Sequence, residues 1–204
     1  MSRQRLKKIF DTNLFSNPKT NAIGFGRLDF SKKKRTIDDI LKRAKIFEIL
    51  SRFQPFLAGS YPIRVEISSS DVDILCEASL EEFTIFCKKK FSKRKNFSIS
   101  EKQFTGVDSI VVRFSFSQLH FELFAQDMPV EKQKAFIHLR CEEKLLNIYG
   151  EELRETVIKY KRNGYGTEKS FALSFGIQTD PYHFIESIYT LEVPIIRRKF
   201  RLMK

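Results

Sequence analysis

The stretch "LAGSYPIRVEISSSDVDILCE", residues Leu57 to Glu77, decides the fold because it places two acids inside an apolar strand. In the predicted strand, Asp71 and Asp73 share one face, about 7 Å apart, while Val72 and Ile74 share the other. Two carboxylates this close destabilise each other unless a cation lies between them. One interpretation is a Mg²⁺ site for phosphoryl transfer, and the other is an edge strand whose solvated acids prevent aggregation.

The residues upstream of the aspartates favour the first interpretation. Gly59 and Ser60 follow a short predicted strand, and a glycine lets the backbone approach a triphosphate whose terminal oxygens the next residue can hold. This order, a Gly-Ser turn, a short spacer and then Asp71-Val72-Asp73-Ile74, resembles the signature of the DNA polymerase beta-like nucleotidyltransferase superfamily. The resemblance implies an enzyme that transfers a nucleoside monophosphate from a nucleoside triphosphate, with ATP as the first expectation, and that uses Mg²⁺ or Mn²⁺ bound by the aspartates.

The superfamily adds a third carboxylate from a neighbouring strand. Glu122 in "HFELF" is acidic, faces away from the predicted core and lies a few tens of residues downstream, so the resemblance assigns it to the metal site and to catalysis. Asp108 is a weaker competitor because it stands at the start of its predicted strand. His120 shares a predicted face with Glu122 and could either orient that carboxylate or be a simple surface histidine.

Three longer blocks resemble a small bacterial family of minimal nucleotidyltransferases catalogued as domain of unknown function 4269. The first block contains the stretch quoted above, and the other two are "FELFAQDMPVEKQKAFIHLRCEEKLL" and "GYGTEKSFALSFGIQTDPYHFIESI". Within them, Gln133 and His138 are predicted to bind the nucleotide, although a helical histidine that shares a face with Glu142 could also be half-buried. Ser60 and Ala125 depart from that family's pattern by exchanging one small residue for another. Gln126, in the same block, could also contact the nucleotide base or ribose, whereas the spacing assigns no role to Lys169, Asp180 and Tyr182.

Periodicity predicts an α/β (α+β) protein with a nucleotidyltransferase-type mixed sheet flanked by helices and a helical C-terminal half. One helix should start at Thr36 as N-cap and end near Phe53, and another should follow a Ser79 to Glu82 capping pattern. Strands are predicted at 56–60, 71–77, 96–100, 108–116 and 119–125, and helices at 130–149, 151–163, 167–175 and 181–191. The predicted divisions are an irregular arm at 1–30, a domain at 31–192 with its sheet core at about 55–125 and helical part at about 130–192, and a basic tail at 193–204.

The formal charge of +12 is clustered at residues 32–35, 87–95 and 197–204. Such clusters permit a nucleic acid partner, RNA or tRNA, but they are equally typical of solvated helix faces. The three cysteines form no CxxC pattern and are expected to be reduced. No apolar run suits a membrane span or signal peptide, so we expect a cytoplasmic protein.

Three functions remain open at the level of sequence. The first is a nucleotidyltransferase whose acceptor could be RNA or tRNA, protein or a small molecule. The second is a catalytically silent nucleotide- or RNA-binding module with the same fold. The third is a toxin-like enzyme that modifies tRNA, which the small size and the basic surface suggest.

Overall fold

This computed structural model describes residues 30–104 and 106–203, with side chains from residue 37 onward, so the predicted arm at 1–30 lies almost wholly outside the described residues. The chain forms two compact units, one ending at Glu48 and the other beginning at Ile49. Helix α2, Phe30–Ala44, starts before Thr36, so the predicted N-cap is wrong. Lys45 has φ 52° and interrupts the predicted long helix, which continues as α3, Ile46–Ile49, and the 3₁₀ helix η1, Ser51–Phe53.

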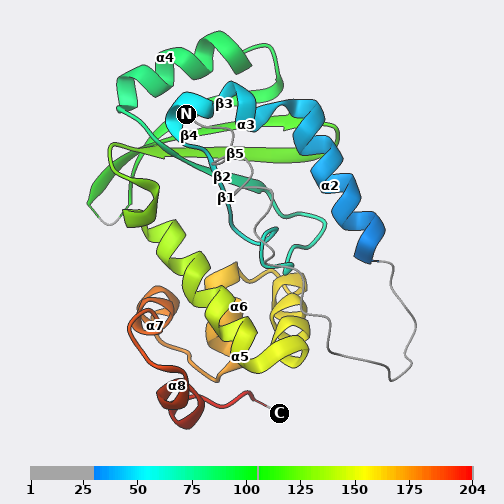
Figure 1. Cartoon of the computed structure of the whole chain (residues 1–204), viewed down its shortest axis with the longest axis vertical. Helices are drawn as coiled ribbons and strands as arrows, with labels where there is room; N and C mark the ends of the chain where they lie inside the picture. The colour runs from blue at the N-terminus through cyan, green and yellow to red at the C-terminus, as the bar shows by residue number, and fades with distance from the viewer. Residues whose placement is uncertain (1–29, 105, 204) are drawn as a thin grey trace. The chain divides into compact units, whose positions relative to one another are not determined.

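The second unit is built on a five-stranded mixed sheet with the order β1-β2-β5-β4-β3 (Figure 1). Strand β2 pairs with β5 in parallel, and the other three pairs are antiparallel. The parallel pair brings together two segments that lie far apart in the sequence, which no local pattern could show. The strands are β1, Phe56–Ala58; β2, Val72–Glu77; β3, Lys95–Phe104; β4, Val107–Phe116; and β5, Leu119–Gln126.

Helix α4, Leu80–Phe91, covers one face of the sheet and starts after Ser79, as predicted, but without a side-chain cap. The rings of Phe91, Phe114 and Phe121 stack at 5.0 and 5.2 Å between α4 and the strands. Because side chains alternate along a strand, Val72 and Ile74 of β2 face this layer and Asp73 faces the other side. In Figure 1, α4 lies above the strands and α5 to α8 lie below them.

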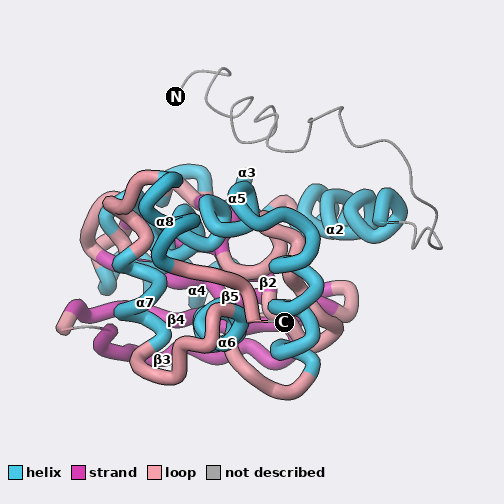
Figure 2. Tube along the Cα trace, turned by 90° about the horizontal axis from the view of Figure 1, so that it is seen from below, coloured by secondary structure: helices cyan, strands magenta, loops and turns pink. Residues whose placement is uncertain are grey.

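The C-terminal half is helical, as predicted. After the 3₁₀ helix η2, Val130–Lys132, it contains α5, Lys134–Arg162; α6, Thr167–Ser174; α7, Pro181–Ser187; and α8, Val193–Lys199. Gly150 has φ 69° and ψ −145° inside α5, so the predicted break there is confirmed. Gly164, with φ 92°, confirms the predicted stop before α6. Figure 2, seen from below the sheet, shows these helices in front of the strands.

The segment 193–204 is not the basic tail that the sequence predicts. It contains α8, and Ile196 and Phe200 are buried in the apolar core of the helical half. The Tyr149 hydroxyl donates to the Phe200 carbonyl at 2.7 Å and fixes the end of the segment. The charge pattern hid these two apolar residues, whose burial makes the segment part of the folded unit. The helix-flanked mixed α/β fold itself is confirmed.

Candidate functional site

The predicted catalytic carboxylates lie on adjacent strands of the sheet. Asp73 of β2 is in register with Glu122 of β5, and Ala58 of β1 and Arg113 of β4 extend the same row. Residues in one row project from the same face, and parallel neighbours are about 4.8 Å apart. Asp71 immediately precedes β2, and its charge acts on Asp73. The sheet therefore presents Asp73 and Glu122 side by side, with Asp71 in the segment just before β2.

The Gly-Ser turn lies directly against these acids. Gly59 follows β1 with φ +67°, a conformation that L side chains rarely adopt, and a Cβ at this position would overlap the Asp73 carboxylate. Ser60 is buried, with 4% of its surface exposed, and its carbonyl accepts a bond from the Val65 amide at 3.1 Å. The turn thus presents backbone, rather than side chains, at residue 59.

Burial, together with the charges of Glu122 and Asp71, raises the pKa of Asp73 to about 7. A buried acid that repels its neighbours is a site that a cation would stabilise. Among the described residues, no group of three or more His, Cys, Asp or Glu side chains is arranged to hold a metal ion. Mg²⁺ is nevertheless often bound by one or two carboxylates completed by water and substrate phosphates, and the Asp71 and Asp73 pair fits that kind of site.

Glu122 is ion-paired with Arg113 at 2.5 Å, and its side chain is 23% exposed. The guanidinium is the nearest recorded partner of this carboxylate, so Arg113 compensates the negative charge that Glu122 adds beside Asp73. The competitor Asp108 accepts a bond from Gln103 at 3.1 Å and pairs with it across β3 and β4, several residues along the strand from the carboxylate row. Position therefore favours Glu122 over Asp108.

Lys161 is the site residue that the sequence interpretation missed. It is 6% exposed, donates to the Thr167 hydroxyl at 3.0 Å, and lies near enough to Asp73 to lower that group's pKa. Burial lowers the pKa of Lys161, opposed by the charges of Glu142, Asp73 and Glu168. The chain contains 37 Lys and Arg residues, so only the tertiary structure distinguishes this one.

His138 contacts two glutamates, one from α6 and one from α7. Its two ring nitrogens lie 3.4 Å from Glu168 Oε1 and 3.2 Å from Glu186 Oε1, and Lys134 donates to Glu186 at 2.5 Å. Although burial opposes it, the hydrogen bonds to both glutamates raise the pKa of His138. His138 is itself mostly buried, so it fixes Glu168 rather than presenting a free ring to a ligand.

Glu142 is buried and 4% exposed, and burial raises its pKa well above the usual range of a glutamate. Three charged groups also act on the pKa of Glu142: Glu168 and Asp73 raise it, and Lys161 lowers it. The acids and the lysine therefore form one electrostatic group that joins α5 and α6 to the carboxylate row of the sheet.

Several predicted or uncommitted residues have structural partners instead. Gln133 is fully buried, and its Nε2 donates to the Cys76 carbonyl at 2.8 Å, so it ties α5 to β2 beneath the site and has no surface for a nucleotide. Gln126 donates to the Ser109 hydroxyl at 2.9 Å. The Asp180 side chain accepts from the Tyr182 amide and caps α7. Lys169 donates to the Gln178 carbonyl at 3.2 Å.

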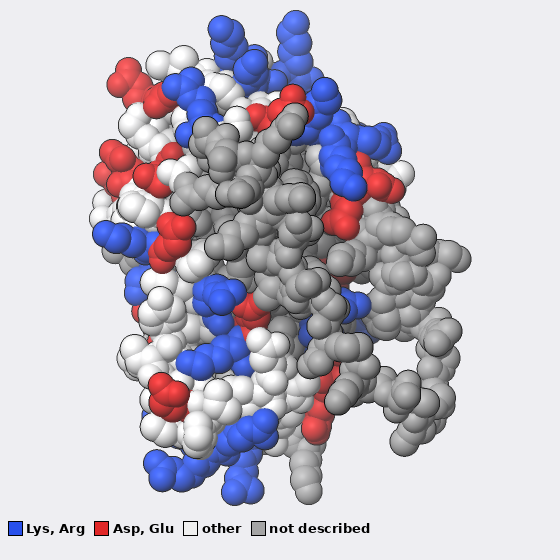
Figure 3. All heavy atoms as spheres, in the orientation of Figure 1, with Lys and Arg blue, Asp and Glu red and all other residues white. Residues whose placement is uncertain are grey.

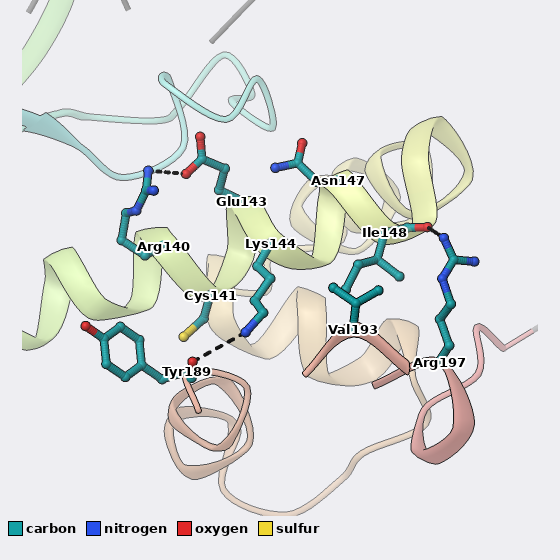
Figure 4. A pocket seen from close by; sticks show the side chains of 9 residues that line it. All are labelled: Arg140, Cys141, Glu143, Lys144, Asn147, Ile148, Tyr189, Val193 and Arg197. Carbon is teal, nitrogen blue, oxygen red and sulfur yellow. Dashed lines mark hydrogen bonds and ion pairs between the residues drawn. The ribbon is translucent and has the colours of Figure 1, made fainter. Parts of the chain in front are cut away.

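A separate cavity of about 480 Å³ is lined by α5, by Tyr189 of the segment that joins α7 to α8, and by α8 itself (Figure 4). Two of its cations serve the fold, because Lys144 donates to the Leu191 carbonyl at 2.6 Å and Arg197 donates to the Ile148 carbonyl at 3.2 Å. None of the carboxylates of the candidate site lines this cavity. The chemistry therefore points to the sheet rather than to this cavity.

The predicted basic clusters do not all remain surface runs. The side chains of residues 32–35 lie outside the description. The exposed Lys88, Lys89 and Lys90 end α4, and Arg197 and Arg198 lie in the last turn of α8, where cations also stabilise a helix terminus. Figure 3 shows Lys and Arg gathered at the upper and lower ends of the molecule, where Figure 1 has α4 and α8.

Fold and site together define an α/β protein with adjacent carboxylates and a glycine turn on one face of a mixed sheet. The chain belongs to the family described as "Domain of unknown function (DUF4269)", which matches residues 39–187. This match confirms the predicted resemblance to domain of unknown function 4269. No curated protein matches the chain. Among the described residues, no helix is both long and apolar enough to cross a bilayer.

Solved structures similar to this one include the RNA terminal uridylyl transferase Cid1, with a TM-score of 0.46 and 12% identity over 90% of this chain. A chain of the GLD-2/RNP-8 complex has a TM-score of 0.47 and 14% identity over 87% of this chain. The polymerase core of TRAMP, an RNA surveillance complex, has a TM-score of 0.43 and 15% identity over 80%. This chain spans 53%, 73% and 49% of those three chains, respectively.

Proposed function

We propose that the protein is a metal-dependent nucleotidyltransferase that transfers a nucleoside monophosphate from a nucleoside triphosphate to an acceptor hydroxyl. The observation that carries this proposal is the register of Asp73 with Glu122 on parallel strands, with Asp71 two residues upstream and the Gly59 backbone against Asp73. Burial and the charges of Glu122 and Asp71 raise the pKa of Asp73, and such a carboxylate suits a divalent cation and a triphosphate. A glycine turn suits close approach of phosphate oxygens.

In the proposed reaction, the acceptor oxygen attacks the α-phosphorus of the triphosphate. One P–O bond forms, the bond to the pyrophosphate oxygen breaks, and Glu122 accepts the proton of the acceptor hydroxyl. Mg²⁺ or Mn²⁺, when bound by Asp71 and Asp73, would neutralise charge on the triphosphate. To accept this proton, Glu122 would have to exchange its ion pair with Arg113 for a contact with the acceptor hydroxyl.

The triphosphate would be held from two sides. Gly59 and Ser60 supply backbone groups from the sheet, and Lys161 with Thr167 faces Asp73 from the helical half. ATP remains the first expectation for the nucleotide. His138 contributes through Glu168, which it holds beside Lys161, and Gln133 supports the strand that carries Asp73.

The test is transfer from each of the four α-labelled nucleoside triphosphates, with Mg²⁺ or Mn²⁺, to cellular RNA, protein and small molecules. Asp73→Asn and Asp71→Asn should each lower the rate about 10³-fold, because the metal supplies several kcal/mol of transition-state stabilisation. Asp127→Asn, at an exposed acid just beyond β5, is the matched control and should keep the rate. Full activity in both site variants would refute the catalytic assignment.

One observation favours a second candidate, a catalytically silent nucleotide-binding module. The third carboxylate is engaged by an arginine, and such a pair could neutralise it permanently. Arg113→Met decides between the two, because it frees Glu122 in either case. In a working enzyme the variant should still transfer nucleotide at a changed rate, whereas a silent module should bind triphosphate with no transfer before or after the change.

A further inference from the structure

The face of the sheet beside the carboxylates carries a polar surface of which the reaction as described uses only Arg113. We define this surface as the sheet shelf, formed by six residues of β3, β4 and β5: Lys95, Asn96, Ser98, Arg113, Ser115 and His120. Pairing places them on one face: Ser98 opposes Arg113, Lys95 opposes Ser115, and Ser115 opposes His120. Arg113 also opposes Glu122, so the shelf is on the same side of the sheet as the candidate site.

The shelf is organised by its own hydrogen bonds. Asn96 Nδ2 donates to Ser115 Oγ at 3.0 Å, and Ser115 Oγ lies 3.1 Å from His120 Nδ1. The positive φ of Asn96, 58°, and a register shift between Lys95 and Ser98 bring this amide onto the row. These contacts align three polar groups across three strands, one row beyond Glu122.

The shelf is open, which bears on what it could bind. Lys95, Asn96, Ser98 and His120 are exposed, and the Arg113 side chain is 40% exposed. Sites for small molecules are concave and enclose most of the ligand, unlike this surface. From β5 to β3 it extends about 10 Å, two strand spacings, which is enough for more than one unit of an extended polymer.

The charge and chemistry of the shelf fit a nucleic acid. Its far edge carries Lys95, next to the exposed Lys93, and Arg113 lies in its middle, so cations line the way toward Glu122. Asn, Ser and His side chains supply the donors and acceptors that a ribose 2′-hydroxyl uses, which distinguishes RNA from DNA. We propose that the sheet shelf binds the 3′ end of a single-stranded RNA and directs its terminal hydroxyl to Glu122. This inference rests on the proposed function, of which it names the acceptor.

Binding is measured without nucleotide or metal, by the fluorescence anisotropy of a 5′-labelled single-stranded oligoribonucleotide in a salt series. Lys95→Glu should raise Kd about 5- to 10-fold and lower the salt slope by about 1. Lys159→Glu, the same charge change at an exposed residue of α5, should change Kd less than about 2-fold. Equal effects of the two variants, or no binding at low salt, would overturn the proposal.

The hydrogen-bonded row of the sheet shelf is tested by one triple variant that carries Asn96→Ala, Ser115→Ala and His120→Ala together. It should weaken RNA binding about 10-fold and remove the preference over DNA of the same sequence, because the 2′-hydroxyl partners are lost. An RNA ending in 4-thiouridine should crosslink to residues 95–122, and crosslinks confined to α8 would contradict the shelf. Shelf binding without any nucleotide transfer would refute the proposed function alone, whereas transfer to another acceptor without shelf binding would refute this inference alone.

Discussion

Gly59 and Asp73 are in direct contact across the β1 and β2 pair, so that a Cβ at residue 59 would occupy the position of the Asp73 carboxylate. Two requirements therefore meet at this glycine: a positive φ of 67°, and the absence of a side chain. The contact with Asp73 is therefore a reason for a glycine at this position that is independent of the proposed phosphate binding.

This contact predicts that Gly59→Ala lowers transfer activity by about 100-fold, because displacement of a metal-binding carboxylate by about 1 Å disrupts the geometry of the reacting groups. Gly106→Ala is the matched control, since Gly106 also has a positive φ, 80°, but has open space around it. Both variants should show the strain of a left-handed residue in thermal unfolding, and only Gly59→Ala should lose activity. Equal loss in both would refute the contact as the cause.

Lys161→Met should raise KM for the triphosphate more than it lowers kcat. A buried ammonium that faces Asp73 would bind the triphosphate through charged hydrogen bonds of about 1.5 to 3 kcal/mol, so the increase in KM should be at least about 10-fold. Initial rates over a range of nucleotide concentrations measure both constants. Lys159→Met, two residues away and exposed, should leave them unchanged, and an unchanged KM in Lys161→Met would exclude the lysine from the site.

Glu142→Gln should stabilise the protein at neutral and higher pH. Burial raises the folded-state pKa of Glu142, so the contribution of this group to stability is present below about pH 4.5 and is lost as the pH rises. Glutamine is neutral at every pH and removes that loss. Urea unfolding from pH 4.5 to 8.5 should show a growing advantage of the variant, with exposed Glu155→Gln as the control. A constant difference across this range would contradict a buried neutral carboxyl.

The His138 cluster predicts a stability maximum in mildly acidic solution. The folded-state pKa of His138 is raised above 6.5, so its contribution is complete below that pH and is lost as the pH rises through the folded value. The pKa values of Glu168 and Glu186 are lowered below 4.5, so their contributions are present above that pH and are lost as it falls. The cluster should therefore contribute most between about pH 4.5 and 6.5.

His138→Gln should lower the unfolding free energy by about 1 to 2 kcal/mol within that window and by less above it. The measurement is chemical unfolding of both proteins from pH 4 to 9. His183→Gln, at an exposed histidine of α7, is the control and should leave the pH profile unchanged. A difference between wild type and His138→Gln that does not vary with pH would show that only packing was lost.

Local patterns determined most of the fold. The alternation around Asp71 and Asp73, the helical spacing after Ser79 and the glycines at 150 and 164 all depend on residues a few positions apart, and each predicted element exists. The predicted helix from Thr36 to Phe53 is too long, because a lysine gives no indication of the left-handed conformation that Lys45 adopts. The segment 193–204 was predicted as a basic tail outside the domain because its two buried apolar residues are surrounded by cations.

The sequence by itself determined the carboxylates and the glycine turn, because their chemistry is set by residue type and short spacing. Only the tertiary structure decided that Arg113 pairs with Glu122, that the charge of Lys161 acts on Asp73, and that Gln133 is bonded to β2. Each of these depends on a parallel strand pair or on helices that return to the sheet from far along the chain. Contacts of that kind depend on how distant segments of the chain pack against and bury one another. The periodicity of a local stretch of sequence does not predict them.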